Sequence, residues 1–473
     1  MQTVLAIDLG GTSLRAALVL PDGQTVALAA RAHRIGDEAD PHDWWRALGE
    51  VLADLPDAEV AGIGLSGFTR SQVLTDAAGT PLRPALCFTD GRAAEQAALL
   101  AESVGDGWTA MNAYHPLARL AWVARHEPAV LAATRHVLQP KDWLAMRLTG
   151  RASCDRIGNA WAMEKCRPRY AGKVRSLALF RQAGIDPSLL PDVLNPWDLV
   201  GHVRHPPDGA PDWVAGLPVF AGSMDTWCGS IGAGALRPGD AYLISGTTDA
   251  GGVLTASPVQ APGLVSLPWG EEVFHIGGPS NAGAGCLSWL AGVLGMADAA
   301  AISALAEVAD PQAPPLLFLP ALSGERAPGW QPQARGGFIG LHHSHGPAEL
   351  ARAVLLGVAF ADRDLLGGAG FSQLLIAGGG ARSELWCQLR ADVLGCLVRR
   401  AAAEEPGITG AALLAWIGLG QFADLAAAQA GLAGGTAAWQ PDEAAHAEAT
   451  RLYGLYQRFR SAGLELSQAL DDR

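Results

Sequence analysis

The sequence has few of the features that are typical of a membrane protein, a secreted protein or a nucleic-acid-binding protein. No uninterrupted apolar run approaches the roughly 18 residues of a membrane span, and Asp8 ends the first apolar run too early for a signal peptide. Lys and Arg number 34 against 47 Asp and Glu, so the net charge of −13 gives a nucleic acid no electrostatic attraction. We expect a cytoplasmic protein with neither kind of partner.

Paired cysteines and established metal or nucleotide motifs are missing too. The seven cysteines are scattered, odd in number and without a C-x-x-C spacing, so we expect free thiols. The run His342-His343-Ser344-His345 lacks separated acidic or cysteine partners and is interpreted as a surface loop. No G-x-x-x-x-G-K-[ST] segment occurs, which excludes a P-loop nucleotide site.

The chain does have ample material for hydrophobic cores. Its 473 residues exceed the roughly 100–200 of one domain, 49% are hydrophobic and only 17% are charged. A helix is expected from Asp40 or His42, with Trp44 and Trp45 either in the core or stacked on a sugar. The strands expected around this helix are 4–7, 14–20, 25–29 and 60–65. This β-β-β-α-β start predicts an α/β domain with a mixed sheet.

The opening pattern returns near residue 240. Strands at 241–245 and 251–254 flank a Gly-Thr-Thr turn, much as the first two strands flank Gly10-Gly11-Thr12. We interpret the two units as an internal duplication. The elements expected afterwards are a strand at 370–377, a helix from near Ser383, a helix at 410–419 and a helical tail.

The two strand–turn–strand units are candidate phosphate sites. Glycine lets backbone N–H groups approach phosphate oxygens, and threonine adds hydroxyl donors. A single turn of this kind is usually only a hairpin, so the pair carries the prediction. Asp8 ends a buried strand before the first turn, where a carboxylate can reach hydrated Mg²⁺; a turn-forming Asp that bonds its own backbone is the alternative.

Asp225 follows a predicted buried strand, 217–221, and precedes a small-residue helix, 226–235. An Asp in this place is commonly a helix N-cap. A carboxylate there is also what a hydroxyl needs for proton removal during phosphoryl transfer. Glycines 378–380 form another strand-to-helix corner, which can admit an adenine or ribose or can serve packing alone.

Taken together, these segments resemble the FGGY family of carbohydrate kinases along nearly the whole chain. The matching segments are Asp8–Arg15, LRPALCFTDGR (82–92), PKDWLAMRLTG (140–150), AGSMDTWCGSIGAGA (221–235), LISGTT (243–248), FLPALSGERAP (318–328), GGFIGLHHSHGPAELARAVLLGVAF (336–360) and GGGARSELW (378–386). The resemblance implies an α/β fold of two actin-like (ribonuclease H-like) ATPase domains flanking a central cleft. It places a sugar-binding domain at 1–240 and a nucleotide-binding domain at 241–473.

The resemblance also implies residue roles. Asp225 would be the catalytic base and Asp8 the metal residue, with MgATP as the phosphate donor. Residues expected at the sugar are Thr69, Arg70, Asp90 and Asp225. Residues expected at the nucleotide are Gly11, Thr12, Arg15, Gly246, Thr247, Thr248, Gly379, Gly380, Ala381 and Ser383. Homodimers are common in this family.

Three departures from the family pattern concern the acceptor and the first turn. Phe68-Thr69-Arg70-Ser71 stands where members acting on D-xylulose usually have Gln-Met-His-Gly, and Arg70 has only hydrogen-bond donors. The first turn reads Gly-Gly-Thr-Ser rather than Gly-Thr-Ser-Gly, and Leu356 replaces a frequent acidic residue. D-xylulose, giving D-xylulose 5-phosphate, is the first choice of acceptor, with D-ribulose, another ketose or a polyol behind it.

Other readings of the chain are open. Glucokinase-like proteins share the actin-like fold and a similar first turn, but they are typically shorter and often carry a zinc cluster. Filament proteins and chaperone ATPases bind nucleotide without phosphorylating a small acceptor, and the segments 62–92 and 221–235 argue against them. A sugar sensor without catalysis is disfavoured by the presence of both Asp8 and Asp225.

Overall fold

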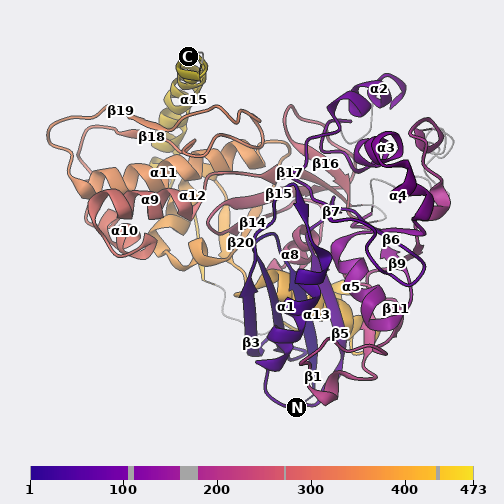
Figure 1. Cartoon of the computed structure of the whole chain (residues 1–473). Coiled ribbons are helices and arrows are strands. Elements are labelled where there is room, and N and C mark those ends of the chain that lie inside the picture. Colours follow the sequence, from indigo (N-terminus) through magenta and orange to yellow (C-terminus); the bar gives the residue numbers. More distant parts are fainter. Residues whose placement is uncertain (1, 105–110, 160–178, 271–272, 433–436, 472–473) are drawn as a thin grey trace. The chain divides into compact units, whose positions relative to one another are not determined.

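The computed structural model describes residues 2–104, 111–159, 179–270, 273–432 and 437–471. The chain forms two compact units, Met1–Gly232 with Gly407–Ala433, and Ala233–Pro406 with Gly434–Arg473. Each is an α/β unit built on one large sheet (Figure 1). Residues 407–433 belong to the first unit, although they follow residue 240 in the sequence. The sugar and nucleotide roles of the two halves remain predictions.

The first unit is organised around a sheet in the order β11-β12-β5-β1-β2-β3, with β13 also paired to β5. Neighbours β1, β2 and β3 run antiparallel, whereas β5 is parallel to β1, β12 and β13. The strands are β1 Thr3–Leu9, β2 Ser13–Val19, β3 Thr25–Ala32, β5 Val60–Gly67, β11 Leu199–His202, β12 Pro218–Phe220 and β13 Ser223–Met224. The predicted mixed sheet is confirmed.

The second unit repeats this arrangement. Its sheet has the order β16-β17-β15-β14-β20-β21-β22, in which β14, β15 and β17 are antiparallel and β20 and β21 continue in parallel. The strands are β14 Asp240–Ser245, β15 Asp249–Thr255, β16 Val265–Pro268, β17 Phe274–Pro279, β20 Gln373–Ala377, β21 Leu397–Arg400 and β22 Ala438–Trp439. The internal duplication is therefore present as a shared strand order.

Helices supply the hydrophobic faces that cover both sheets. In the first unit they are α1 Pro41–Ala53, α2 Ala94–Val104, α3 Pro116–His126, α4 Pro128–Ala133, α5 Pro140–Thr149, α8 Asp225–Ala233, α13 Pro406–Gly418 and α14 Leu425–Ala430. In the second they are α9 Ala284–Leu294, α10 Ala299–Ala306, α11 Pro347–Leu366, α12 Glu384–Leu394 and α15 Glu443–Asp471. Short strands complete the fold: β4 Glu38–Ala39, β6 Val73–Thr75, β7 Ala85–Leu86, β8 His136–Leu138, β9 Ser153–Asp155, β10 Asp192–Leu194, β18 Leu317–Leu319 and β19 Gly337–Ile339.

Helix α13 explains why a late segment joins the first unit. Figure 1 shows it in orange beside the indigo strands of that unit. Its Ile408 and Ala411 share a buried cluster with Val4 of β1. A β-carbon on Gly64 would lie 2.1 Å from the carbonyl oxygen of Ala411, so β5 needs glycine for this helix to approach.

Helix α1 resolves the two alternatives for Trp44, whereas Trp45 is partly buried and packs against the same core. Asp40 caps it by accepting a hydrogen bond from the His42 N–H (2.9 Å), as the sequence predicts. Trp44 is 2% exposed and makes edge contacts with Phe68 and Trp143, so it is a core residue.

The cysteines and histidines of the described residues form no metal centre. Six cysteines are free and buried, and Cys166 lies outside the described residues. No group of three or more His, Cys, Asp or Glu that could hold a metal ion occurs in the described ranges. The His342–His345 segment forms an exposed loop between β19 and α11, which confirms that interpretation.

Membrane-spanning potential was also expected to be low. Within the described residues, no single helix is both long and apolar enough to cross a membrane. Helices α9 and α10 meet the length and composition requirement only as a pair bent by 87°. Both contribute buried residues to a hydrophobic core that they share with α11.

Because His275 is buried, we expect the unfolding free energy of the protein to decrease at acidic pH. Its side chain stacks on Trp269 and lies 3.1 Å from the Tyr242 hydroxyl, and burial lowers its pKa to about 3. Folding thus favours the neutral ring, and this contribution is lost as the pH falls below the unfolded-state pKa of about 6.5. From pH 7 to pH 5, the wild type should lose about 2 kcal/mol more unfolding free energy than His275→Gln. Urea unfolding at both pH values measures this; equal losses would contradict it.

Candidate active site

The two predicted acidic residues lie at one edge of the first unit's sheet. Strands β1 and β13 each run parallel to β5, where Ser66 stands opposite both Asp8 and Ser223. The carboxyl ends of these strands therefore meet. Ser66 donates a hydrogen bond from its hydroxyl to Asp8 Oδ1 (2.7 Å). Asp225 follows β13 directly, so the fold brings together two carboxylates that are more than 200 residues apart in sequence.

Electrostatics distinguish Asp225 from an ordinary helix cap. Its Oδ1 accepts hydrogen bonds from the N–H (2.7 Å) and the hydroxyl (3.1 Å) of Thr226. An N-cap side chain would instead accept from an N–H two or three residues ahead. Burial, and then the negative charge of Asp8, raise the pKa of Asp225 to about 7. A carboxyl group that titrates near neutral pH can take up and release a proton under ordinary conditions.

The first glycine–threonine turn connects β1 to β2 next to Asp8. Gly10 donates its N–H to the carbonyl of Ser13 (3.0 Å), and its own carbonyl lies 2.8 Å from His33 Nε2. Thr12 is exposed at the tip and Gly11 is partly exposed. Arg15 pairs with Asp8 in the strand register, so it is also at the base of the turn.

The second turn, Gly246-Thr247-Thr248, connects β14 to β15 in the other unit. The carbonyls of Gly246 and Thr247 accept hydrogen bonds from Ala284 and Gly285 (both 2.9 Å), which fix the turn to the start of α9. Thr247 and Thr248 are exposed, so their hydroxyls are accessible to a ligand. The turn is thus rigid in its backbone and open at its tip.

The predicted adenosine corner adjoins this second turn within the same unit. A β-carbon on Gly380 would lie 2.1 Å from Ser245 Oγ, so packing alone requires that glycine. Gly379 is exposed, and a β-carbon there would meet no atom within 4 Å. Ser383 caps α12 by accepting from the Trp386 N–H (3.2 Å), and Ala381 is buried. Among the predicted residues of this corner, Gly379 is therefore the most exposed.

A buried ion cluster supports the second turn. Arg390 is fully buried and donates to Asp249 (2.7 Å), Asp362 (2.8 Å) and Ser245 (2.9 Å). Ser245 and Asp249 are the last residue of β14 and the first of β15, so the arginine clamps both ends of the turn. The sequence offered no signal for this cluster, because Ser245 and Asp249 lie more than 100 residues before Asp362 and Arg390.

Two of the predicted sugar residues, Thr69 and Arg70, follow β5, and Asp90 comes after β7. The Thr69 hydroxyl donates to Gln139 Oε1 (2.8 Å) and to the Gly158 carbonyl (3.2 Å), so it fixes the loop. Asp90 is buried and paired with Arg92 (2.7 Å), so protein groups already bind its carboxylate. Acceptor contacts by these residues and by Arg70 remain predictions.

A buried network that sequence reasoning missed holds the loop before Asp225. Lys141 Nζ lies 2.9 Å from Asp155 Oδ2 and 2.5 Å from Asp142 Oδ1, and it donates to the Ala221 carbonyl (3.1 Å). Ser223 donates to Asp155 Oδ1 (2.8 Å). The network therefore fixes the chain on both sides of Gly222 and, through β13, the backbone position of Asp225.

The same network reaches the loop that carries Thr69. Asp155 Oδ1 accepts from the Gly158 N–H (2.7 Å), and the Gly158 carbonyl accepts from Gln139 Nε2 (2.7 Å) as well as from Thr69. Lys141 and Asp142 lie in the PKDW segment that the sequence singled out without a role for either residue. The loop after β5 and the segment that joins β12 to β13 are thus held by one set of hydrogen bonds.

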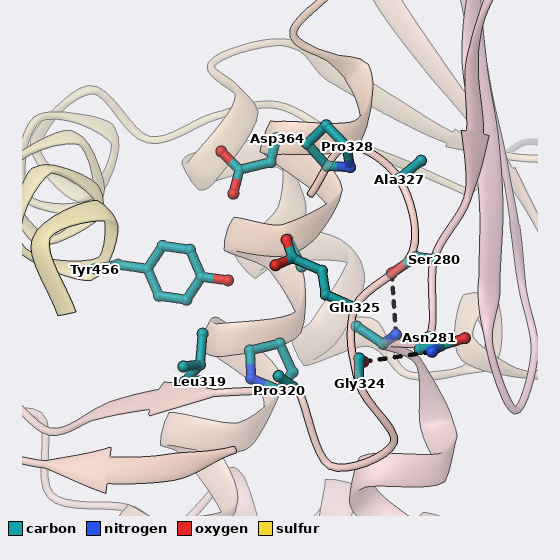
Figure 2. A pocket seen from close by; sticks show the side chains of 13 residues that line it. Ser280, Asn281, Leu319, Pro320, Gly324, Glu325, Ala327, Pro328, Asp364 and Tyr456 are labelled. Atoms are coloured by element: carbon teal, nitrogen blue, oxygen red, sulfur yellow. Dashed lines mark hydrogen bonds between the residues drawn. The ribbon is translucent and has the colours of Figure 1, made fainter. Parts of the chain in front are cut away.

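A pocket in the second unit contains none of the predicted site residues. Figure 2 shows the Tyr456 hydroxyl and the Glu325 carboxylate pointing toward one another there. Glu325 is paired with Arg460 (2.8 Å), and Asp364 accepts a hydrogen bond from Tyr453. Its acidic groups therefore already have protein partners.

Comparisons with known proteins agree with the geometry. Residues 3–232 match the N-terminal domain, and residues 241–419 the C-terminal domain, of the FGGY family of carbohydrate kinases. A xylulose kinase of Escherichia coli (strain K12) is 33% identical over 453 residues, covering 87% of this chain and 89% of that protein.

Solved structures share the fold. The xylulose kinase of Rhodospirillum rubrum has a TM-score of 0.81 at 30% identity, covering 98% of this chain and 100% of its own. The gluconate kinase of Lactobacillus acidophilus has a TM-score of 0.85 at 22% identity, covering 99% and 100%. These matches confirm the fold of two actin-like ATPase domains. The chain belongs to the FGGY family of carbohydrate kinases and is a sugar kinase.

Proposed function

We propose that this kinase phosphorylates D-xylulose to D-xylulose 5-phosphate with ATP, and that Asp225 is the general base. The names of the E. coli and R. rubrum relatives support the acceptor. The placement of Asp225 beside Asp8, at an edge where three strands end, carries the proposed mechanism.

In the proposed reaction, the acceptor hydroxyl oxygen attacks the γ-phosphorus while the bond to the β,γ-bridging oxygen breaks and ADP leaves. Asp225 takes the hydroxyl proton as the new O–P bond forms. Because its Oδ1 is bound to Thr226, that side of the carboxylate is held in place. A pKa of about 7 lets Asp225 accept the proton and then release it to solvent.

The proposed position for Mg²⁺ is the sheet edge that carries Asp8 and Asp225. Burial, and then the negative charge of Asp8, raise the pKa of Asp225, and a divalent cation beside the two carboxylates would relieve their repulsion. Asp8, partly exposed and oriented by Ser66, would hold the ion through water. The described residues contain no all-protein cage of three acidic or histidine ligands, in keeping with an ion that is bound mainly by water and phosphate. When bound, Mg²⁺ would neutralise phosphate charge.

The nucleotide assignment rests on the two turns and the glycine corner. Exposed Thr12, Thr247 and Thr248 offer hydroxyl donors for phosphates, and Gly379 leaves open space for adenosine. Gly11, Arg15, Gly246, Gly380, Ala381 and Ser383 complete the proposed set. Within it, Gly380, Ala381 and Ser383 act through the shape of the corner.

A coupled assay of ADP release tests the function directly. The purified protein is mixed with MgATP and each of D-xylulose, D-ribulose, other ketoses and polyols. We expect ADP release to depend on the acceptor and D-xylulose to give the highest kcat/KM among these neutral sugars. ADP release at the same rate with and without every acceptor would contradict a kinase role and favour a non-catalytic ATPase.

A further inference from the structure

Arg70 lies in the loop after β5, and its positive charge has no acidic partner among the described residues. Among the described residues, none accepts a hydrogen bond from its guanidinium, and no carboxylate forms an ion pair with it. The surrounding protein desolvates the group and thereby lowers its pKa. An arginine in such surroundings is costly unless an anion compensates it.

The backbone of Arg70 is held from both sides. Its N–H donates to Gln139 Oε1 (3.2 Å), and its carbonyl accepts a hydrogen bond from buried Arg119. Its φ of 58° lies in the left-handed region, which is rare for a residue with a side chain. Strain of this kind persists where the neighbours hold it, and it is concentrated at ligand sites. The loop therefore presents Arg70 from a fixed backbone.

The charged groups around Arg70 do not neutralise it. Arg119 and His115 are close enough that the charge of Arg70 lowers the pKa of both, after the larger effect of burial. Asp90, which stabilises the charge of Arg119, is itself paired with Arg92. The loop after β5 therefore carries a positive potential, at the sheet edge where β13 leads into Asp225.

We propose that Arg70 binds the carboxylate of a sugar acid, so that aldonates are a second class of acceptor for this kinase. A guanidinium matches a carboxylate in charge and in its paired hydrogen-bond geometry. D-xylulose and D-xylonate have the same carbon-chain length and a terminal hydroxyl. They differ at the other end, where D-xylulose has a hydroxymethyl group next to a ketone and D-xylonate has a carboxylate. The proposal rests on the proposed sugar kinase activity, with Asp225 as the base for both acceptors.

The step is the same for both acceptors. The terminal hydroxyl oxygen forms a bond to the γ-phosphorus, the bond to the β,γ-bridging oxygen breaks, and the proton passes to Asp225. The carboxylate of the aldonate takes no part in bond exchange. Arg70 is thus a specificity residue, and its effect should follow the charge of the acceptor.

The test compares D-xylonate with xylitol, which has CH₂OH in place of the carboxylate. We expect the wild type to favour D-xylonate in kcat/KM by about 10- to 100-fold, as a charge-assisted hydrogen-bond pair implies. Arg70→Gln should lose most of this preference, because its loss in kcat/KM should be much larger for D-xylonate than for xylitol. Arg70→Lys should retain part of it, because the charge remains without the planar pairing. Arg31→Gln, which removes two exposed ion pairs of β3 with Glu50 and Asp54, is the control and should leave the preference unchanged.

Thermal unfolding of each variant shows that a change in preference is not a folding defect. If Arg70→Gln does not fold, the comparison of Arg70→Lys with the wild type still tests the proposal. Equal kcat/KM for D-xylonate and xylitol in the wild type would overturn it, as would equal losses for both acceptors in Arg70→Gln. Activity on D-xylulose without activity on D-xylonate overturns this inference and leaves the proposed function intact. Absence of phosphorylation of every acceptor overturns both.

Discussion

Replacing Asp225 with asparagine is expected to lower kcat on D-xylulose by about 10²–10⁴-fold, the usual contribution of general-base catalysis. Asparagine preserves the size of the side chain and its oxygen for Thr226, which holds Asp225 Oδ1 in the wild type. It cannot take a proton from the acceptor hydroxyl. The loss should therefore appear in kcat, measured by the coupled assay under saturating acceptor and MgATP.

Two measurements separate this loss from a loss of structure or binding. The melting temperature and the affinity for ATP of Asp225→Asn should stay near those of the wild type, because the substitution removes an unfavourable interaction with Asp8. Asp54→Asn, at an exposed carboxylate that pairs with Arg31, is a control and should retain full turnover. An Asp225→Asn protein with wild-type kcat would rule out Asp225 as the base.

Arg390→Met is expected to cost the second unit about 3–5 kcal/mol of unfolding free energy, the typical loss when one partner of a buried ion pair is removed. The substitution leaves Asp249 and Asp362 buried without their cation, and Ser245 loses a donor. Because Ser245 and Asp249 begin and end the second turn, we also expect weaker ATP binding. Urea unfolding of the second unit and ATP titration measure the two effects.

Arg451→Met provides the matched control. Arg451 is about half exposed and pairs with Glu448 three residues earlier on α15, an arrangement worth at most about 1 kcal/mol. The loss in Arg390→Met should also shrink at lower pH, because protonation removes the unpaired buried charge. Similar losses in the two variants would contradict a special role for the buried cluster.

Much of the architecture was predictable because it depends on local patterns. Alternating apolar residues, glycine turns and the cap at Asp40 lie close together in sequence, and they located β1, β2, α1 and the second strand–turn–strand unit. The duplication was visible for the same reason, since each copy starts with the same strand–turn–strand pattern. Residue 225 was placed after a strand and at the start of a helix, as the structure has it.

Contacts between distant segments could not be predicted in the same way. Helix α13 packs on the first sheet through Gly64, and the Lys141–Asp155–Ser223 network joins three separate segments behind Asp225. Nothing in the local pattern of a lysine or serine distinguishes a surface residue from a buried partner. The role of Trp44 was open for the same reason, and burial against Phe68 and Trp143 decided it.

The sequence by itself determined the family, the two turns and the identity of the acidic residues, because motif spacing and turn chemistry are local properties. Only the tertiary structure decided which of these residues meet. Parallel pairing of β1 and β13 with β5 places Asp8 beside Asp225, and the burial of Asp225, followed by the negative charge of Asp8, raises the pKa of Asp225 to about 7. The environment of Arg70 also depends on the tertiary structure. Only the folded chain shows that, among the described residues, no carboxylate pairs with its guanidinium.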